Sequence, residues 1–204
     1  MTKKMIIGLD FDGVIAYNPF RSIRMPISYI KRHLLGVHRL TFFKPKNELQ
    51  KIIWSIMHES SVFPGQGVKL LKEIAKRPDL EFHLITARYH FLDKQLVRWL
   101  HSNDLYDVFS TINLNKLDEQ PHLFKERMVK EKKLDVFIED NLDIVKHLSK
   151  TTSTKVLWIY NILDRNYPYP QKFPFLQKAL ESVLWNICFR LPITHHTFLA
   201  YLFM

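Results

Sequence analysis

The chain has 204 residues, of which 47% are hydrophobic and 25% charged, a balance typical of a globular protein with a buried core. Its formal net charge of +10 favours anionic partners, such as phosphorylated metabolites, nucleic acid or acidic membrane surfaces. The single cysteine, Cys188, excludes an internal disulfide and fits a reducing compartment. The apolar run before Asp10 is too short for a signal-peptide core, and no run reaches the ~20 residues that span a bilayer. We therefore expect a cytoplasmic protein.

The first predicted element is a buried strand that ends in acidic residues. Residues 6–9 form an apolar run too short for a helix, and Asp10, Asp12 and Gly13 follow within four positions. In a parallel α/β sheet, the carboxyl ends of the strands form the edge that binds ligands. Two carboxylates so close together repel each other unless a cation or a shared proton relieves them, and Mg²⁺ suits oxygen ligands. A simple polar turn is the alternative, because Asp-Gly is a common turn pair.

Residues 17–61 differ in character from their surroundings and predict a small helical insertion. Apolar residues recur at helical spacing in two stretches, which begin near Ile27 and Leu49. Basic side chains dominate, and Glu48 is the only acid of the insertion before Glu59. The basic residues could steer a phosphorylated substrate, although a solvated helix face explains them equally well. The histidines of the insertion show no metal-ligand spacing, so a zinc site is not expected.

Short apolar strands and amphipathic helices alternate after the insertion. This alternation predicts βαβ units and a parallel sheet, which is an α/β fold. The predicted strands are Phe82–Ile85, Val108–Ile112, Val136–Ile138 and Val156–Tyr160, and the predicted helices are Val68–Lys76, Leu92–Leu100, Pro121–Lys132 and Leu142–Leu148.

Residues with chemical potential follow three of the predicted strands. The segments Asp10–Asp12, Thr86–Arg88 and Glu139–Asp140 each come directly after an apolar run. Because parallel strands end at the same edge of a sheet, we expect all three segments to meet there. This coincidence favours a functional site over three unrelated polar turns.

These segments resemble the motifs of the haloacid dehalogenase-like (HAD) hydrolase superfamily, whose members are mostly magnesium-dependent phosphatases. The resemblance runs in motif order from about Lys4 to Tyr160. Asp10-Phe11-Asp12-Gly13-Val14 is similar to the first motif, Leu84-Ile85-Thr86-Ala87-Arg88 to the second, and Glu139-Asp140 to the acidic pair of the fourth.

The third motif of the family is a lysine in or near the helix before the last acidic strand. Lys125 is the preferred candidate, because its separation from Glu139 is the spacing seen in related members. Several other lysines compete with it in this lysine-rich segment, namely Lys116, Lys130, Lys132 and Lys133.

The resemblance implies a Rossmann-like three-layer α/β/α fold with a parallel sheet. Residues 1–16 and 62–165 would form the hydrolase core, and residues 17–61 would form a helical cap of the C1 type that closes over the active site. Residues 166–204 would form an apolar C-terminal helical extension. The apolar, aromatic and Thr-Ala-Arg details are closest to the small 5'-nucleotidase-like branch.

The resemblance also implies a catalytic mechanism. Asp10 would attack phosphorus and form an aspartyl-phosphate, and Asp12 would donate a proton to the leaving group and later take one from water. Thr86 would hydrogen-bond a phosphate oxygen, and Lys125 would neutralise developing charge and hold Asp10 in place.

The implied cofactor is Mg²⁺, held by Asp10, the backbone carbonyl of Asp12, and Asp140, with Glu139 as a direct or water-bridged ligand. The implied contacts to substrate come from Thr86, Ala87, Arg88 and Lys125. For Arg88, a surface arginine that pairs with a helix end is an equally good interpretation.

The predicted function is hydrolysis of a small phosphorylated metabolite, with a nucleotide as one candidate and no nucleic acid partner expected. The alternative is a phosphate- or nucleic-acid-binding module that has kept the fold without turnover, which the net charge permits. A metal-dependent glycosyltransferase that uses Asp10 and Asp12 would explain neither Thr86–Arg88 nor Glu139–Asp140.

The C-terminal segment is apolar and predicts one more helix. Apolar residues recur at helical spacing over Phe173–Arg190, and Pro192 ends the pattern. Packing on the core or self-association is the preferred role, and contact with a membrane surface is the alternative. His195 and His196 are expected to be packing or surface residues rather than ligands.

Overall fold

The computed structural model describes residues 4–17, 42–59, 63–162 and 164–188, and every structural statement below concerns these residues. The first helix predicted for the insertion, near Ile27, lies outside them. So do Pro192, His195 and His196.

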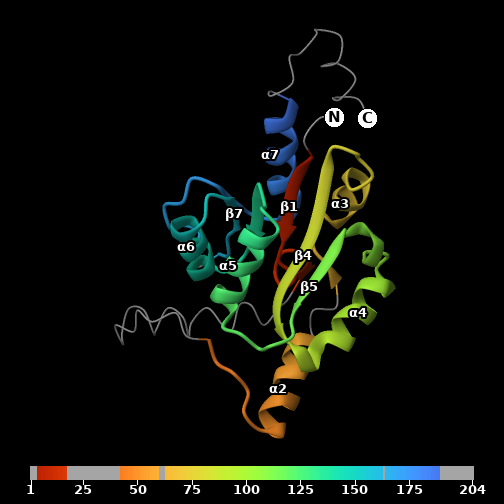
Figure 1. The fold of residues 1–204 in the computed structure, drawn as a ribbon, viewed down its shortest axis with the longest axis vertical. Coiled ribbons are helices and arrows are strands. Elements are labelled where there is room, and N and C mark those ends of the chain that lie inside the picture. The colour runs from red at the N-terminus through yellow and green to blue at the C-terminus, as the bar shows by residue number, and fades with distance from the viewer. Residues whose placement is uncertain (1–3, 18–41, 60–62, 163, 189–204) are drawn as a thin grey trace.

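A six-stranded sheet forms the centre of the molecule, and its strands lie in the order β5-β4-β1-β6-β7-β8 (Figure 1). All neighbouring strands are parallel. From β1 the chain moves outward on one side to β4 and β5, then returns to β6 beside β1 and continues outward on the other side. The strand order therefore reverses at β1, which makes the carboxyl ends of β1 and β6 the expected ligand site. The strands are β1 (Met5–Leu9), β4 (Leu80–Tyr89), β5 (Thr111–Asn115), β6 (Val136–Glu139), β7 (Lys155–Ile159) and β8 (Lys172–Phe173).

Helices cover both faces of this sheet, so the predicted three-layer α/β/α fold is confirmed. One face packs against α3 (Val68–Ile74), α4 (Asp93–Ser102) and α7 (Leu176–Cys188), and the other against α5 (Pro121–Glu131) and α6 (Leu142–Thr151). The strands alternate between the two cores as their pleat requires. In β6, Val136 and Ile138 pack on the first face and Phe137 packs on the second.

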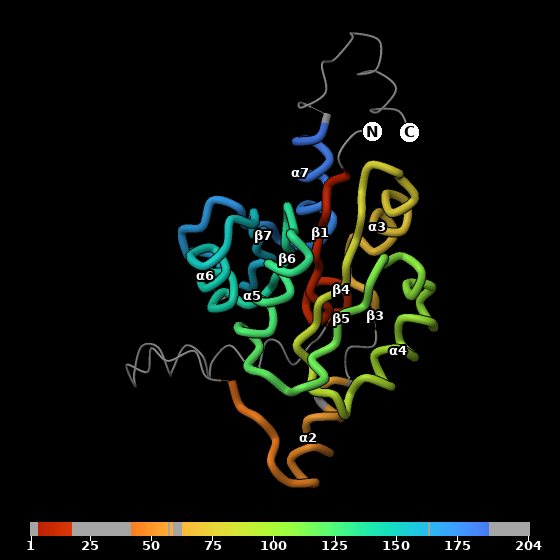
Figure 2. Tube along the Cα trace, viewed as in Figure 1, coloured from red at the N-terminus to blue at the C-terminus, as the bar shows by residue number. Residues whose placement is uncertain are grey.

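The insertion leaves and re-enters the core through a small antiparallel pair, β2 (Ala16–Tyr17) with β3 (Phe63–Pro64). Its described helix, α2 (Glu48–Glu59), lies beyond the carboxyl ends of β4 and β5 (Figure 2). This helix confirms the second helix predicted for the insertion, the one that begins near Leu49. One of its faces is exposed and carries four apolar side chains, those of Leu49, Ile52, Ile53 and Ile56.

Two strand predictions were wrong at their ends. The second strand was expected to start at Phe82 and to end at Thr86–Arg88, whereas β4 starts at Leu80 and runs to Tyr89, with a register shift against β5 between Thr86 and Tyr89. The third was expected to start at Val108, but Tyr106–Val108 forms a 3₁₀ turn and β5 begins at Thr111. Both differences arise because pairing with neighbouring strands, which are distant in sequence, decides where a strand starts and ends.

The described part of the C-terminal segment belongs to the core. The short strand β8 extends the sheet beside β7, and α7 buries Leu176, Ala179, Leu180 and Val183 against the same core as α3. Core packing or self-association was the preferred role for this segment, and core packing is confirmed for α7. Within the described residues, none of the helices combines the length and apolar character that a membrane crossing requires.

Candidate active site

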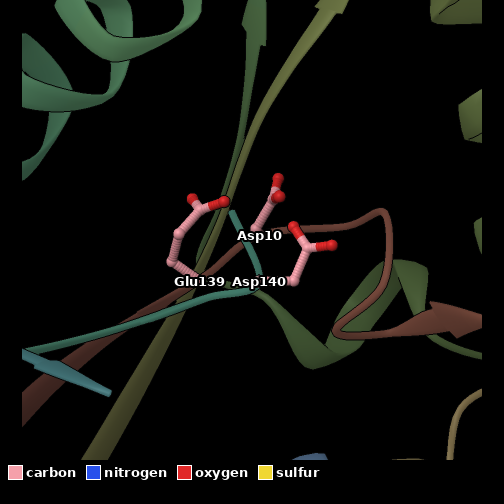
Figure 3. A group of neighbouring side chains, drawn as sticks. All are labelled: Asp10, Glu139 and Asp140. Carbon is pink, nitrogen blue, oxygen red and sulfur yellow. The ribbon is translucent and has the colours of Figure 1, made fainter. Parts of the chain in front are cut away.

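Acidic residues from two adjacent strands meet where the strand order reverses. Asp10 comes directly after β1, and its backbone N–H donates to the Ile138 carbonyl at 2.9 Å, which fixes it against the end of β6. Glu139 is the last residue of β6 and Asp140 follows it. Figure 3 shows the carboxyl groups of Asp10, Glu139 and Asp140 together at this edge, and each offers an oxygen within 4.8 Å of the other two. The predicted meeting of the first and fourth motifs is therefore present in the structure.

The turn after Asp10 depends on a glycine. The N–H groups of Ile15 and Ala16 both donate to the Phe11 carbonyl, at 2.9 and 3.0 Å, which makes a tight loop immediately after β1. Gly13 lies inside this loop with φ of 78°, in the left-handed region that side chains other than glycine rarely adopt. The loop brings Asp12 back toward the sheet edge beside Asp10.

Lys125 lies among these acids and is almost completely buried. Its Nζ is 2.9 Å from Asp10 Oδ2 and 2.6 Å from Glu139 Oε2, and only 3% of its side chain is exposed. We refer to Lys125, Asp10, Glu139 and Asp140 as the Lys125 cluster. Among the competing lysines, Lys130 pairs instead with Glu126 on the exposed side of α5.

The Lys125 cluster holds three carboxylates and one ammonium, and this imbalance shifts the pKa values. Burial, with Asp140 and Asp12 nearby, raises the pKa of Asp10 to about 6 in spite of Lys125. Burial and the neighbouring acids likewise raise the pKa of Glu139 well above its usual range. Burial alone would lower the pKa of Lys125, but Asp10 and Glu139 raise it. The lysine therefore remains charged, but its single positive charge does not neutralise all three carboxylates.

Local hydrogen bonds fix the fourth-motif segment in place. Glu139 Oε1 accepts the Asn141 backbone N–H at 3.0 Å. The Asn141 side chain is the N-cap of α6, because its Oδ1 accepts the N–H groups of Asp143 and Ile144. Trp158 Nε1 donates to the Asp140 carbonyl at 3.1 Å. The acidic pair is thus held on a rigid strand–helix junction.

Asp12 belongs to a second, separate set of charges. The Arg88 guanidinium binds its carboxylate with two hydrogen bonds, Nε to Oδ2 at 2.8 Å and Nη2 to Oδ1 at 2.6 Å. His58 Nδ1 lies 3.6 Å from Asp12 Oδ2. Burial would raise the pKa of Asp12, but Arg88 and His58 overcome it and lower that pKa well below the usual range. We refer to Asp12, Arg88 and His58 as the Arg88 cluster.

The interpretation of Arg88 as a surface residue was wrong. Only 3% of its side chain is exposed, and its guanidinium lies over the Phe11 ring at 4.5 Å from the centroid. His58 was not predicted as a site residue, although α2 places it within reach of Asp12. No signal in the local sequence separates it from the other histidines of the insertion, because the contact exists only once α2 lies on the core.

Thr86 and Ala87 lie on β4 at the same sheet edge. Leu84 pairs with Leu9, the last residue of β1. Thr86 comes two residues after Leu84 and is therefore level with the turn that follows Asp10. Thr86 is buried, and its hydroxyl accepts the Arg88 backbone N–H at 3.3 Å. Ala87 is partly buried and packs against the core shared with α5 and α6. The contacts of these residues with substrate stay predictions.

Solved structures share this fold at low sequence identity. The HAD hydrolase YfnB of Bacillus subtilis, determined bound to magnesium, matches with a TM-score of 0.60 and 11% identity over 89% of this chain and 99% of that chain. A β-phosphoglucomutase-like structure from Thermotoga maritima matches at 0.58 and 14% over 89% and 99%. CbbY from Rhodobacter sphaeroides, in complex with phosphate, matches at 0.55 and 13% over 86% and 96%.

Comparisons by sequence give no match. No protein-family model fits the chain, and no curated protein is similar enough in sequence to pair with it. At 11–14% identity, the solved structures establish the fold. The chemistry must therefore be argued from the side chains of this chain.

Proposed function

We propose that this chain, which has the fold of HAD-superfamily hydrolases, is a magnesium-dependent phosphomonoester hydrolase that works through an aspartyl-phosphate on Asp10. The observation that carries the proposal is the Lys125 cluster. A buried lysine contacts Asp10 and Glu139 at the point where the strand order reverses, and the acids still outnumber it by three to one. Such a cluster is costly to bury, and a ligand that brings positive charge explains it better than a structural role does.

The donor set fits magnesium. Asp10, Asp140 and Glu139 offer carboxylate oxygens within 4.8 Å of one another, and hard oxygen donors are what this cation prefers. We propose that Asp10, the Asp12 backbone carbonyl and Asp140 hold the ion, with Glu139 as a direct or water-bridged ligand. When bound, Mg²⁺ would supply the positive charge that lets an anionic nucleophile approach an anionic phosphate.

In the first step, an Asp10 carboxylate oxygen attacks phosphorus, and the bond from phosphorus to the ester oxygen breaks. The leaving oxygen takes a proton from Asp12. In the second step, Asp12 takes a proton from the water that attacks phosphorus, the bond from phosphorus to the Asp10 oxygen breaks, and inorganic phosphate leaves. Asp10 is a free carboxylate again, and the proton count closes over one cycle. Because Arg88 favours the ionised form of Asp12, the first proton would arrive with the substrate, whose phosphate has a second pKa near ~6.

Two further side chains would act on the phosphoryl group. The ammonium of Lys125 would neutralise charge that develops on phosphate oxygens while it keeps Asp10 in place. The Thr86 hydroxyl, with the backbone of Ala87, would hydrogen-bond a phosphate oxygen. The Arg88 side chain is already bound to Asp12, so its proposed contact with substrate is the weakest of the assignments.

We propose that residues 17–61 act as a C1-type cap and that the substrate is a small phosphorylated metabolite. Aromatic rings gather where the cap meets β4: Trp54 lies 5.5 Å from Phe43 and 6.3 Å from Tyr89, measured between ring centroids. Aromatic rings close in the chain to the residues proposed to bind phosphate suit a substrate with a planar group, which supports a nucleotide and the 5'-nucleotidase-like branch as finer candidates.

The test is a phosphatase assay over nucleotides, sugar phosphates and other phosphomonoesters, with magnesium and with a chelator. We expect turnover of at least one class with magnesium and its loss with the chelator. Asp10→Asn should abolish it, whereas Asp107→Asn, on an exposed turn of the core, should not. Failure to turn over any phosphomonoester, together with tight oligonucleotide binding, would favour the non-catalytic binding module.

A further inference from the structure

The contacts of Arg88 join three parts of the molecule. From the end of β4, its guanidinium binds both carboxylate oxygens of Asp12 on the loop after β1. Its Nη2 also donates to the backbone carbonyl of His58, at 3.4 Å, near the end of α2. The guanidinium also lies over the ring of Phe11. A two-hydrogen-bond pair fixes the direction of a carboxylate as well as its charge.

The same end of β4 holds the beginning of the described cap segment. The Tyr89 hydroxyl donates to the Phe43 carbonyl at 2.6 Å, and the Trp54 ring lies against both of these residues. Arg88 and Tyr89 are consecutive residues at the irregular end of β4. They contact the cap segment at His58 and Phe43, which are 15 residues apart in the chain. His58 is buried in this arrangement, with 7% of its surface exposed.

We propose that Arg88 is a positioning residue that orients the Asp12 carboxylate and links it to the seating of α2 through the His58 carbonyl. This inference rests on the proposed function for its kinetic consequence. When α2 lies on the core, Arg88 has all three of its partners and Asp12 points in one direction. When α2 lifts away, Arg88 loses its contact with the cap, and the Asp12 carboxylate loses its neighbour His58 as well. The cap therefore controls proton transfer as well as access.

A substrate contact would have a different signature. An arginine that binds the phosphate of the substrate contributes to ground-state binding, so its loss raises KM. An arginine that acts through Asp12 leaves KM nearly unchanged and lowers kcat, and its effect disappears once Asp12 can no longer transfer a proton. The bidentate geometry favours the second case, because both oxygens of Asp12 are already hydrogen-bonded to the guanidinium.

The kinetic test is a double-mutant cycle of Arg88→Met and Asp12→Asn with Mg²⁺ and the best phosphomonoester. We expect Arg88→Met to lower kcat by about 10- to 100-fold with KM changed by less than about threefold. In the Asp12→Asn background it should change kcat by less than about threefold. Arg88→Lys keeps the positive charge but cannot form both hydrogen bonds to Asp12, so its kcat should lie between those of Arg88→Met and the wild type. Arg98→Met, on the exposed face of α4, should have the kcat of the wild type. A raised KM, or independent effects in the cycle, would overturn the positioning role.

A second readout needs no turnover. Amide hydrogen exchange should be about tenfold faster over α2 in Arg88→Met than in the wild type, with exchange over α6 unchanged. If Arg88→Met alone does not fold, the comparison is made between Asp12→Asn and the Asp12→Asn/Arg88→Met double variant, which buries no unpaired charge. Unchanged exchange over α2 would overturn the link to the cap. A wild type without phosphatase activity would defeat the proposed function, whereas the exchange result would still decide whether Arg88 seats α2.

Discussion

The Lys125 cluster and the Arg88 cluster lie at one edge of the sheet but have opposite balances of charge. Lys125 contacts Asp10 and Glu139, whose pKa values are raised, and Asp140 lies beside these two acids. Asp12 is instead a single carboxylate that contacts an arginine and a histidine, and its pKa is lowered. The two aspartates are separated by a single residue in the sequence, so their surroundings shift their pKa values in opposite directions. The first cluster has more acids than bases, and in the second Arg88 neutralises the carboxylate.

Removing the lysine should be the most damaging change to either cluster. Lys125→Met would leave Asp10 and Glu139 buried without a counter-charge, and breaking a buried pair in this way costs about 3–5 kcal/mol of unfolding free energy. Turnover should fall by at least about 100-fold. Lys130→Met, on the exposed side of the same helix, should change the free energy by less than about 0.5 kcal/mol. Urea unfolding of both variants measures the difference, and equal losses would contradict the central position of Lys125.

The same Asp-to-Asn substitution should have opposite effects on stability in the two clusters. Without metal, Asp10→Asn removes one of three crowded carboxylates and should raise the free energy of unfolding by about 1 kcal/mol. Asp12→Asn leaves the buried Arg88 guanidinium without its anion and should lower that free energy by about 3 kcal/mol. Asp10→Asn should lack activity, whereas Asp12→Asn should keep a low residual kcat. Thermal unfolding in a chelator at pH 7 provides the comparison, and changes of the same sign would show that the two clusters do not differ in charge balance.

Magnesium should stabilise the protein through the Lys125 cluster. At a concentration about 100-fold above its Kd, the ion should add about 2.7 kcal/mol to the free energy of unfolding. The added stability should be lost in Asp140→Asn, where one carboxylate is missing, and retained in Asp107→Asn. Thermal unfolding in a magnesium titration measures this. Equal stabilisation of wild type and Asp140→Asn would remove Asp140 from the proposed ligands.

The pH dependence of the metal-free protein follows from the raised pKa of Asp10. Because the folded state holds this proton up to about pH 6 and the unfolded state releases it near ~3.9, the stabilising contribution of protonated Asp10 is present at low pH and is lost as the pH rises through about 6. Glu139, whose pKa is also raised, extends the loss to higher pH. Asp10→Asn should flatten the profile of unfolding free energy between pH 4 and ~7. A difference in unfolding free energy between wild type and Asp10→Asn that stays constant over this range would contradict the assigned charge balance.

The smallest effect is expected at Thr86, which lies between the two clusters. Thr86→Val removes a hydroxyl that accepts the Arg88 N–H, so stability should fall by about 1 kcal/mol and turnover by about tenfold. Thr86→Ser keeps the hydroxyl and should retain most of the activity. Steady-state kinetics with both variants separates a role of the hydroxyl from a role of the side-chain volume, and a loss in Thr86→Ser with Thr86→Val unaffected would indicate the latter.

The Lys125 cluster could be predicted from the sequence because its members follow periodic elements. Apolar runs located β1 and β6, and parallel strands necessarily bring Asp10 and Glu139 to one edge. Lys125 was chosen among several lysines by its spacing from Glu139, and the structure places it 2.6 Å from that residue. Its place on the buried side of α5 agrees with this choice.

Asp12 and Arg88 were predicted as site residues, but their pairing and the place of His58 were missed, because these contacts cross long stretches of chain. Arg88 is 76 residues from Asp12 in sequence, and the irregular end of β4 that turns its side chain inward has no local signature. His58 reaches Asp12 only because α2 lies over the carboxyl edge, which depends on contacts such as that of Tyr89 with Phe43. Tertiary contacts of this kind set the orientation of side chains that periodicity cannot place.

The most direct test of the account is to trap the phosphoryl group on Asp10. The protein would be mixed with Mg²⁺ and its best phosphomonoester, quenched in acid within one turnover, and mapped by peptide mass spectrometry. The account predicts a phosphoryl group on Asp10, dependent on magnesium and absent from Asp10→Asn. Full turnover without a modified Asp10, or a phosphoryl group carried by another residue, would contradict it.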